Sequence, residues 1–102
     1  MSKFLLLITT ECSKKKAKRI AKLLLKKKLA ACVSLRDIYS IYEWEGKIEE
    51  VSEVEIMIKS KPELKKTLLV FLQKMTSYDI PQIIYKKFNS EKKYKNWLSK
   101  SF

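Results

Sequence analysis

The chain has 102 residues, enough for one hydrophobic core, so we expect a single domain over residues 1–102. Apolar residues make up 46% of it, an ordinary share for a globular protein, and no apolar run is long enough for a membrane-spanning helix. The net charge is +12, but Arg19 and Arg36 are the only arginines, and the lysines spread over every predicted helix. Because bidentate recognition of phosphates and bases depends on arginine, this pattern favours a solvated lysine-rich surface over a nucleic-acid partner.

The N-terminal apolar run predicts a central strand over Lys3–Thr9, buried on both faces. No small-residue cleavage site follows the run, so we interpret it as a strand and not as a signal peptide. The chain contains two cysteines, Cys12 and Cys32, which are too few for a disulfide framework. Without an export signal we expect a cytoplasmic protein in which both cysteines are thiols.

A helix is predicted from Ser13 or Thr10, either of which can cap it, to about Lys28. Its apolar residues recur at helical spacing, and lysines occupy much of the other side. The residues of the apolar face are Ala17, Ile20, Ala21, Leu24 and Leu25.

The next segment predicts a long β-hairpin. Two β-rich runs, Ala30–Trp44 and Lys47–Lys59, flank Glu45 and Gly46, and Gly46 is the only glycine in the chain. A two-residue turn that ends in glycine is a hairpin signal, because the tight turn requires positive φ. With Trp44 opposite Lys47, the predicted cross-strand pairs are Val33–Ile58, Leu35–Ile56, Arg36–Glu55 and Asp37–Val54.

The length of this hairpin predicts an oligomer. Fifteen residues at roughly 3.3 Å each form an arm of about 50 Å. A compact chain of this size has a radius of gyration of about 13 Å, so the arm extends beyond its own domain. Its far half is rich in apolar residues on both faces, namely Ile38, Tyr39, Ile41, Tyr42, Trp44, Ile48 and Val51. Either the arm bends back at a bulge or another subunit covers it, and we favour a second subunit and an obligate homo-oligomer.

The C-terminal half completes a β-α-β-β-α-β order with one further helix. Pro62 predicts the start of a helix that runs to about Met75, with an apolar stripe of Leu64, Leu68, Phe71, Leu72 and Met75. Residues 76–79 are predicted to form a turn, and a strand is predicted over Gln82–Phe88. Pro81 lies just before this strand, and proline is confined to the start or edge of a strand because it has no N–H to donate. Ser90 is predicted to cap a last helix that buries Tyr94, Trp97 and Leu98. This order predicts an α+β, ferredoxin-like sandwich: a four-stranded antiparallel sheet with helices on one face.

Several function classes are excluded or disfavoured by composition. The chain has no histidine, which excludes Ser-His-Asp and Cys-His catalysis and any zinc site built from histidine. One glycine cannot make a GxGxxG motif or a P-loop. The predicted central strands lack the stacking aromatics of an RNA-recognition domain, and the loop after the first strand lacks the arginine that a small phosphate-hydrolysing enzyme needs. We expect no enzyme, whereas a signalling trimer that binds nucleotides between its subunits stays open.

Some residues have both a structural and a functional interpretation. Cys12 lies near a helix start, and its simplest interpretation is an ordinary thiol. Cys32 follows two alanines, and its simplest interpretation is a small packed residue. The functional alternative for both is metal binding, because thiolates bind Cu(I) or zinc. Tyr42 and Trp44 are interface anchors or a ligand pocket, and the interface is favoured. Alternation places Glu49, Glu53 and Glu55 on one strand face and Glu50 on the other, which favours a solvated or salt-bridged strand over a hard-cation site.

Several motifs, taken together, resemble the CutA-type divalent-cation tolerance family. They are Leu29-Ala30-Ala31-Cys32-Val33, the run from Ser40 to Lys47, Glu53, Ile58-Lys59, Tyr78-Asp79-Ile80-Pro81 and the terminal Tyr94, Trp97 and Leu98. The resemblance implies a ferredoxin-like subunit in a homotrimer and a cytoplasmic role in tolerance of divalent metals, especially copper. It also implies a ligand cleft between subunits, with Tyr42, Trp44, Glu53, Lys59, Tyr78 and Pro81 at the matching positions.

One departure from the family pattern affects the metal expectation. The family usually has His-Pro before the tyrosine and glutamate after the proline, whereas this chain has Thr76-Ser77 and Gln82. Imidazole suits Cu(II) far better than threonine or glutamine does, so we expect weaker or different binding of copper or another divalent cation. Any remaining metal site would use Glu53, Cys12 or Cys32. Two alternatives stay open: a lysine-rich binding module for anionic partners, whose binding would fall steeply with salt, and a PII-like effector-binding signalling trimer.

Overall fold

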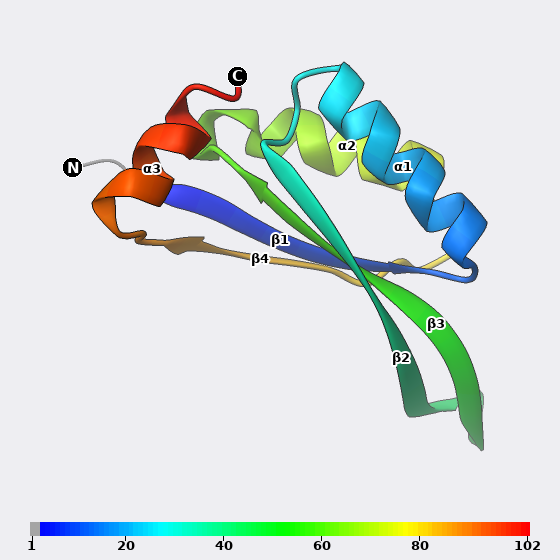
Figure 1. The fold of residues 1–102 in the computed structure, drawn as a ribbon. Coiled ribbons are helices and arrows are strands. Elements are labelled where there is room, and N and C mark those ends of the chain that lie inside the picture. The colour runs from blue at the N-terminus through cyan, green and yellow to red at the C-terminus, as the bar shows by residue number, and fades with distance from the viewer. Residues whose placement is uncertain (1–2) are drawn as a thin grey trace.

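The computed structural model describes residues 3–102. Its elements, in chain order, are β1 (Phe4–Glu11), α1 (Lys14–Lys26), β2 (Cys32–Trp44), β3 (Lys47–Ser60), the 3-10 turn η1 (Pro62–Leu64), α2 (Lys65–Met75), β4 (Ile83–Phe88) and α3 (Lys92–Ser99). The strands form one antiparallel sheet in the order β2-β3-β1-β4. Helices α1 and α2 cover one face of this sheet, and α3 lies at the end where β1 begins (Figure 1). The predicted α+β, ferredoxin-like fold with a long hairpin and a C-terminal helix is confirmed.

The core forms where the apolar helix stripes meet the two central strands. Leu5 and Leu7 of β1 and Ile56 and Ile58 of β3 are almost completely buried against the helices. The buried residues from the helices are Ala17, Ile20 and Leu24 of α1 and Leu68 and Leu72 of α2. A smaller cluster of Phe4, Ala31 and Leu98 fixes α3 to the end of the sheet. Apart from Ala31, these residues belong to the apolar runs and stripes that the sequence predicts.

Helix α1 begins as predicted and ends earlier. The Ser13 hydroxyl accepts a hydrogen bond from the Lys16 amide at 3.2 Å, so Ser13 is the cap and Thr10 belongs to β1. The helix ends at Lys26 because Lys28 adopts a φ of 60°, which turns the chain back towards the sheet. Leu25, at the margin of the predicted apolar face, is exposed.

The hairpin has the predicted register over its whole length. Trp44 pairs with Lys47, Arg36 with Glu55 and Val33 with Ile58, and the same register runs without a bulge to the pair Cys32–Lys59. Strand β1 pairs with β3 only from Val54 onwards, so the distal half of the hairpin has no other strand beside it. Figure 1 shows this arm extending past the rest of the sheet in a molecule of 46 × 24 × 23 Å. The arm therefore does not fold back on its own chain, and Tyr39, Ile41 and Ile48 are more than 60% exposed.

The turn at the tip of the arm depends on positive φ at both of its residues. Glu45 has a φ of 51° and Gly46 a φ of 79°, as in the tight turns that suit the twist of a hairpin. We expect Gly46→Ala to destabilise the chain by about 1–2 kcal/mol, because a left-handed conformation strains a residue with a Cβ. Space is not the cause, since an added Cβ would meet nothing within 4 Å. Urea unfolding measures the change, and Glu45→Asn is the control, which should be neutral or stabilising because asparagine tolerates positive φ. Equal stability of Gly46→Ala and the unmodified chain would contradict the strain argument.

The helix predicted from Pro62 begins as the 3-10 turn η1 and becomes α-helical at Lys65, and the last helix differs from the prediction in two details. Glu91, not Ser90, caps α3, because its carboxylate accepts a hydrogen bond from the Tyr94 amide at 2.8 Å, while the Ser90 hydroxyl donates to the Glu91 carbonyl. Trp97 is 49% exposed and stacks on Tyr94 instead of entering the core. Residues four apart share a helix face, so Tyr94 and Leu98 face the sheet and Trp97 lies at the margin.

Candidate functional site

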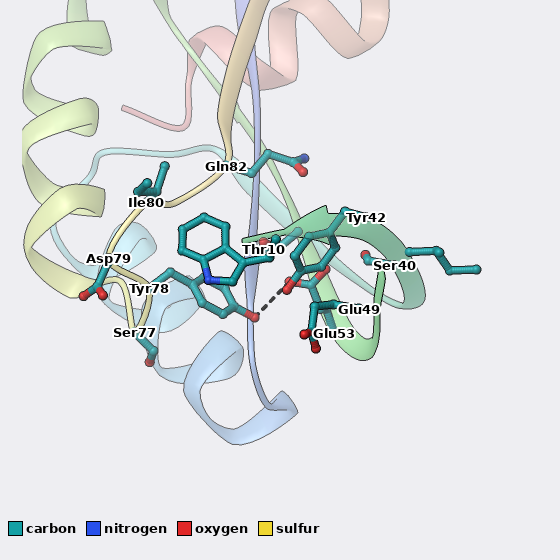
Figure 2. Close-up of a pocket in the computed structure, with 12 residues that line it drawn as sticks. Thr10, Ser40, Tyr42, Glu49, Glu53, Ser77, Tyr78, Asp79, Ile80 and Gln82 are labelled. Carbon is teal, nitrogen blue, oxygen red and sulfur yellow. Dashed lines mark hydrogen bonds between the residues drawn. The ribbon is translucent and has the colours of Figure 1, made fainter. Parts of the chain in front are cut away.

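A groove of about 810 Å³ lies between the arm and the loop that joins α2 to β4. Figure 2 shows its lining side chains, which come from three separate parts of the chain. The arm contributes Ser40, Ile41, Tyr42, Trp44, Glu49 and Glu53; the loop contributes Ser77, Tyr78, Asp79, Ile80 and Gln82; and β1 contributes Thr10. The groove exists because the arm extends beyond β1 and the loop crosses the end of the sheet beside it.

A hydrogen bond between Tyr78 and Glu53 joins the loop to the arm. The Tyr78 hydroxyl donates to the Glu53 carboxylate at 2.9 Å, and the two side chains point towards each other in Figure 2. Burial raises the pKa of Tyr78 well above its usual value, and the hydrogen bond to Glu53 raises it further. Tyr78 is therefore a neutral hydrogen-bond donor throughout the physiological pH range.

The charged side chains that line the groove are all acidic. They are Glu49 and Glu53, which the strand alternation places on one face of β3, and Asp79 of the loop. Glu50 faces the other side of the arm, where its carboxylate accepts a hydrogen bond from the Tyr39 hydroxyl at 3.1 Å. Of the 23 basic residues of the chain, none within residues 3–102 lines the groove itself, and Lys16 reaches its edge, where its ammonium donates to the Ser77 hydroxyl at 3.0 Å. The groove is thus suited to a cation, and the aromatic rings of Tyr42, Trp44 and Tyr78 add faces that attract one.

Glu11 is a buried acid behind the groove that the sequence did not single out. It ends β1, is 1% exposed, and its carboxylate accepts hydrogen bonds from the backbone amides of Cys12 at 3.0 Å and Ser77 at 3.2 Å. Burial alone would raise the pKa of Glu11, but the hydrogen bonds from Ser77 and Cys12 outweigh it, and the pKa lies below its usual value. The only signal in the sequence is the position of Glu11 at the end of a buried apolar run.

Glu11 should make the stability of the chain depend on pH. Since its pKa in the folded state lies below the ordinary 4.5, ionised Glu11 stabilises the fold fully above that pH. This contribution is lost as the pH falls through the folded-state pKa. We expect Glu11→Gln to be less stable than the unmodified chain at neutral pH and to lose less stability between about pH 6 and about pH 3. Urea unfolding across this range measures the difference, with the exposed Glu63→Gln as control, and parallel curves for Glu11→Gln and the unmodified chain would contradict the assignment.

The structure brings four of the six predicted cleft residues into the groove. Tyr42, Trp44, Glu53 and Tyr78 line it, and Pro81 lies between two lining residues without lining it itself. Lys59 lies elsewhere, opposite Cys32 in the sheet, and its Nζ donates a hydrogen bond to the Tyr94 hydroxyl at 3.0 Å. This hydrogen bond raises the pKa of Lys59, although burial acts in the opposite direction. Within one chain, Lys59 therefore belongs to the α3 end of the sheet.

The predicted metal ligands do not converge within one chain. Cys12 is an exposed free thiol and Cys32 a half-buried one. Over residues 3–102, no group of three or more cysteine, aspartate, glutamate or histidine side chains is arranged to hold a metal ion. Glu53 is already the acceptor for Tyr78, and the neighbouring Gln82 is a poor copper ligand. The residues of a single chain thus do not fit a copper site.

Comparisons with known proteins are consistent with one another. A family profile described as CutA1 divalent ion tolerance protein matches residues 5–101. The mouse Protein CutA is 47% identical over 73 residues, which cover 71% of this chain and 41% of that protein. The divalent-cation tolerance protein CutA of Pectobacterium atrosepticum is 39% identical over 87 residues, covering 83% of this chain and 79% of the relative.

The fold matches solved structures of the same kind. The structure of a periplasmic divalent cation tolerance protein CutA from Archaeoglobus fulgidus has a TM-score of 0.91 and 34% identity to this chain, and the match covers 96% of this chain and 97% of that one. The chain spans about two fifths of the length of the mouse and human relatives. Within residues 3–102, no helix has the length and apolar character needed to cross a membrane.

Proposed function

Because the chain belongs to the CutA1 divalent ion tolerance family, we propose that it is a non-enzymatic cytoplasmic protein that takes part in tolerance of divalent metal ions, including copper. In this proposal residues 1–102 form one domain, and three copies assemble into a homotrimer through the arms. The groove of each chain then becomes a cleft between subunits that binds a metal ion or a small effector. The free thiols Cys12 and Cys32 are compatible with the reducing cytosol.

The arm supports the homotrimer. Tyr39, Ile41 and Ile48 are 62%, 63% and 69% exposed, and Trp44 at the tip is 47% exposed. Large apolar side chains that are exposed on both faces of an arm without a bulge mark an interaction site. In a trimer each arm would pack on a different surface of the next copy, so the contact repeats three times and covers the apolar residues of every arm.

The acidic lining of the groove is the observation that carries the ligand proposal. Glu49, Glu53 and Asp79 meet in one groove of a chain whose net charge is +12. Such a groove attracts cations and repels phosphates and carboxylates, so the ligand is a metal ion or a small organic cation. Since Thr76 and Gln82 replace better copper ligands, we expect copper to bind more weakly than a site with histidine would allow.

Native mass spectrometry tests the proposal, with Cu(I), Cu(II) or tetramethylammonium added to the 102-residue chain. A trimer that gains one copper or one tetramethylammonium per chain, and loses it in Glu53→Gln, supports a cation cleft. The matched control is Glu50→Gln on the opposite face of the same strand. A trimer that binds none of the three probes would refute the cation cleft, and a monomer would refute the assembly. Tight, stoichiometric Cu(II) binding would contradict the expectation that a chain without histidine binds copper weakly.

A second candidate function is supported by the surface of α1. This helix exposes seven basic residues and no acidic one: Lys14, Lys15, Lys16, Lys18, Arg19, Lys22 and Lys26. An anionic partner would bind this face, and the affinity would fall steeply as salt is raised. Titration with heparin at two salt concentrations separates this binding module from the cation cleft, because the charged side chains that line the cleft are acidic.

A further inference from the structure

Glu11 differs from the other acids of the chain in its burial and in its partners. It is the only acidic residue of the described segment 3–102 that is buried, with 1% of its surface exposed. The ion pairs of this segment join Lys14 to Asp37 and Arg36 to Glu55, so no lysine or arginine neutralises Glu11. A carboxylate in such a position is costly unless hydrogen bonds satisfy it. The hydrogen-bond donors that satisfy the Glu11 carboxylate therefore indicate what it does in the fold.

The two oxygens of Glu11 connect segments that are far apart in the sequence. Oε1 accepts from the amide of the next residue, Cys12, at 3.0 Å. Oε2 accepts from the amide of Ser77, 66 residues away, at 3.2 Å. Ser77 directly follows Thr76, the C-cap residue of α2, and directly precedes Tyr78. The carboxylate thus ties the end of β1 to the start of the loop that lines the groove.

The loop has few other fixed points. The Tyr78 amide donates to the Thr76 hydroxyl at 3.0 Å, a bond within the loop itself. The Lys16 ammonium donates to the Ser77 hydroxyl at 3.0 Å, but this contact is exposed and therefore weak. We propose that Glu11 is a positioning residue of the groove, whose buried carboxylate holds the Ser77 amide and so places Tyr78 against Glu53. The proposal rests on the proposed function only in that the groove is taken as the ligand site.

Only a residue with a backbone N–H at position 77 can be held in this way. Proline has no N–H, and the family resemblance leads one to expect proline there. Thr76 has φ −62° and ψ 146°, the extended conformation that a residue before proline adopts. Ser77→Pro can therefore be introduced without moving Thr76, and it removes the hydrogen bond while leaving the charge of Glu11 in place.

The test follows Tyr78 and its neighbours by NMR in the ligand-free 102-residue chain. Glu11→Gln and Ser77→Pro are compared with the exposed control Glu63→Gln. We expect Glu11→Gln to accelerate amide exchange at Ser77 and Tyr78 by on the order of tenfold or more, with the amides of β1 and β3 unchanged. We expect both variants to lower the pKa of Tyr78 towards the ordinary 10.0, as read from tyrosine ring carbons, because the released ring leaves Glu53 and enters water.

The Ser77→Pro variant separates positioning from charge. Glu11, Glu53 and Cys12 all lie close enough to raise the pKa of Tyr78, so Glu11→Gln alone would lower it by removing one negative charge. Ser77→Pro keeps all three groups, and an unchanged Tyr78 pKa in this variant, with the fold intact, would overturn the proposal. Global unfolding of both variants would also overturn it, since Glu11 would then serve the fold and not the loop. The result does not depend on whether the groove binds copper, because no metal or ligand is present.

Discussion

Ile48→Asp should be monomeric at concentrations at which the unmodified chain forms its proposed trimer. Ile48 lies near the tip of the arm on β3, is 69% exposed in the single chain and pairs across the hairpin with Glu43. An aspartate at this position is solvated in a monomer, so the subunit fold should be retained, with a cost of about 1 kcal/mol or less from the like charge of Glu43 opposite. In an assembly that covers the arm, the same carboxylate would be buried without a partner in each subunit, at a cost of several kcal/mol per site. Sedimentation equilibrium measures the loss of assembly.

The control for this experiment is Val70→Asp. Val70 is 47% exposed on α2 and lies away from the arm, so it receives the same charge on an apolar position outside the proposed interface. Val70→Asp should keep the oligomeric state of the unmodified chain. If Ile48→Asp kept it as well, the arm would not be the surface that holds the subunits together.

Ile58→Ala should cost about 2–5 kcal/mol of the free energy of unfolding. Ile58 is 0% exposed and lies on the central strand β3 between Leu7 of β1 and Val33 of β2. Truncation leaves a cavity under both helices, and the surrounding strands cannot collapse into it without breaking their register. A typical domain has a total stability of about 5–15 kcal/mol, so this single change removes a large share of it. Urea unfolding at one fixed chain concentration measures the effect.

Val70→Ala is the matched control, because it also truncates a β-branched residue but at an exposed position. It should change the stability by less than about 0.5 kcal/mol. Assembly adds to the apparent stability of the folded chain, so both variants are also compared in the Ile48→Asp background. A loss for Ile58→Ala no larger than that for Val70→Ala would mean that Ile58 does not belong to a tightly packed core.

Local signals in the sequence predicted the elements and the register of the hairpin. Gly46 marked the turn, and counting outwards from it predicted pairs as distant as Val33–Ile58, because antiparallel strands without a bulge keep one register. The helical spacing of Ala17, Ile20 and Leu24 predicted the buried face of α1 in the same way. In contrast, Trp97 lies outside the core, since the contacts of a short helix depend on how it meets the sheet.

The arrangement of the groove was decided by the tertiary structure. Tyr78 and Glu53 are 25 residues apart and Glu11 and Ser77 are 66 apart, and no local pattern relates the members of either pair. Their contacts depend on the path of one loop across the end of the sheet, which follows from the packing of α2 and the position of β4 beside β1. The sequence by itself therefore determined the strands, the helices and the long arm, because these depend on local periodicity and a single turn. The sequence has 11 acidic residues, and only the tertiary structure identifies Glu11 as the one that is buried and bonded to the loop of the groove.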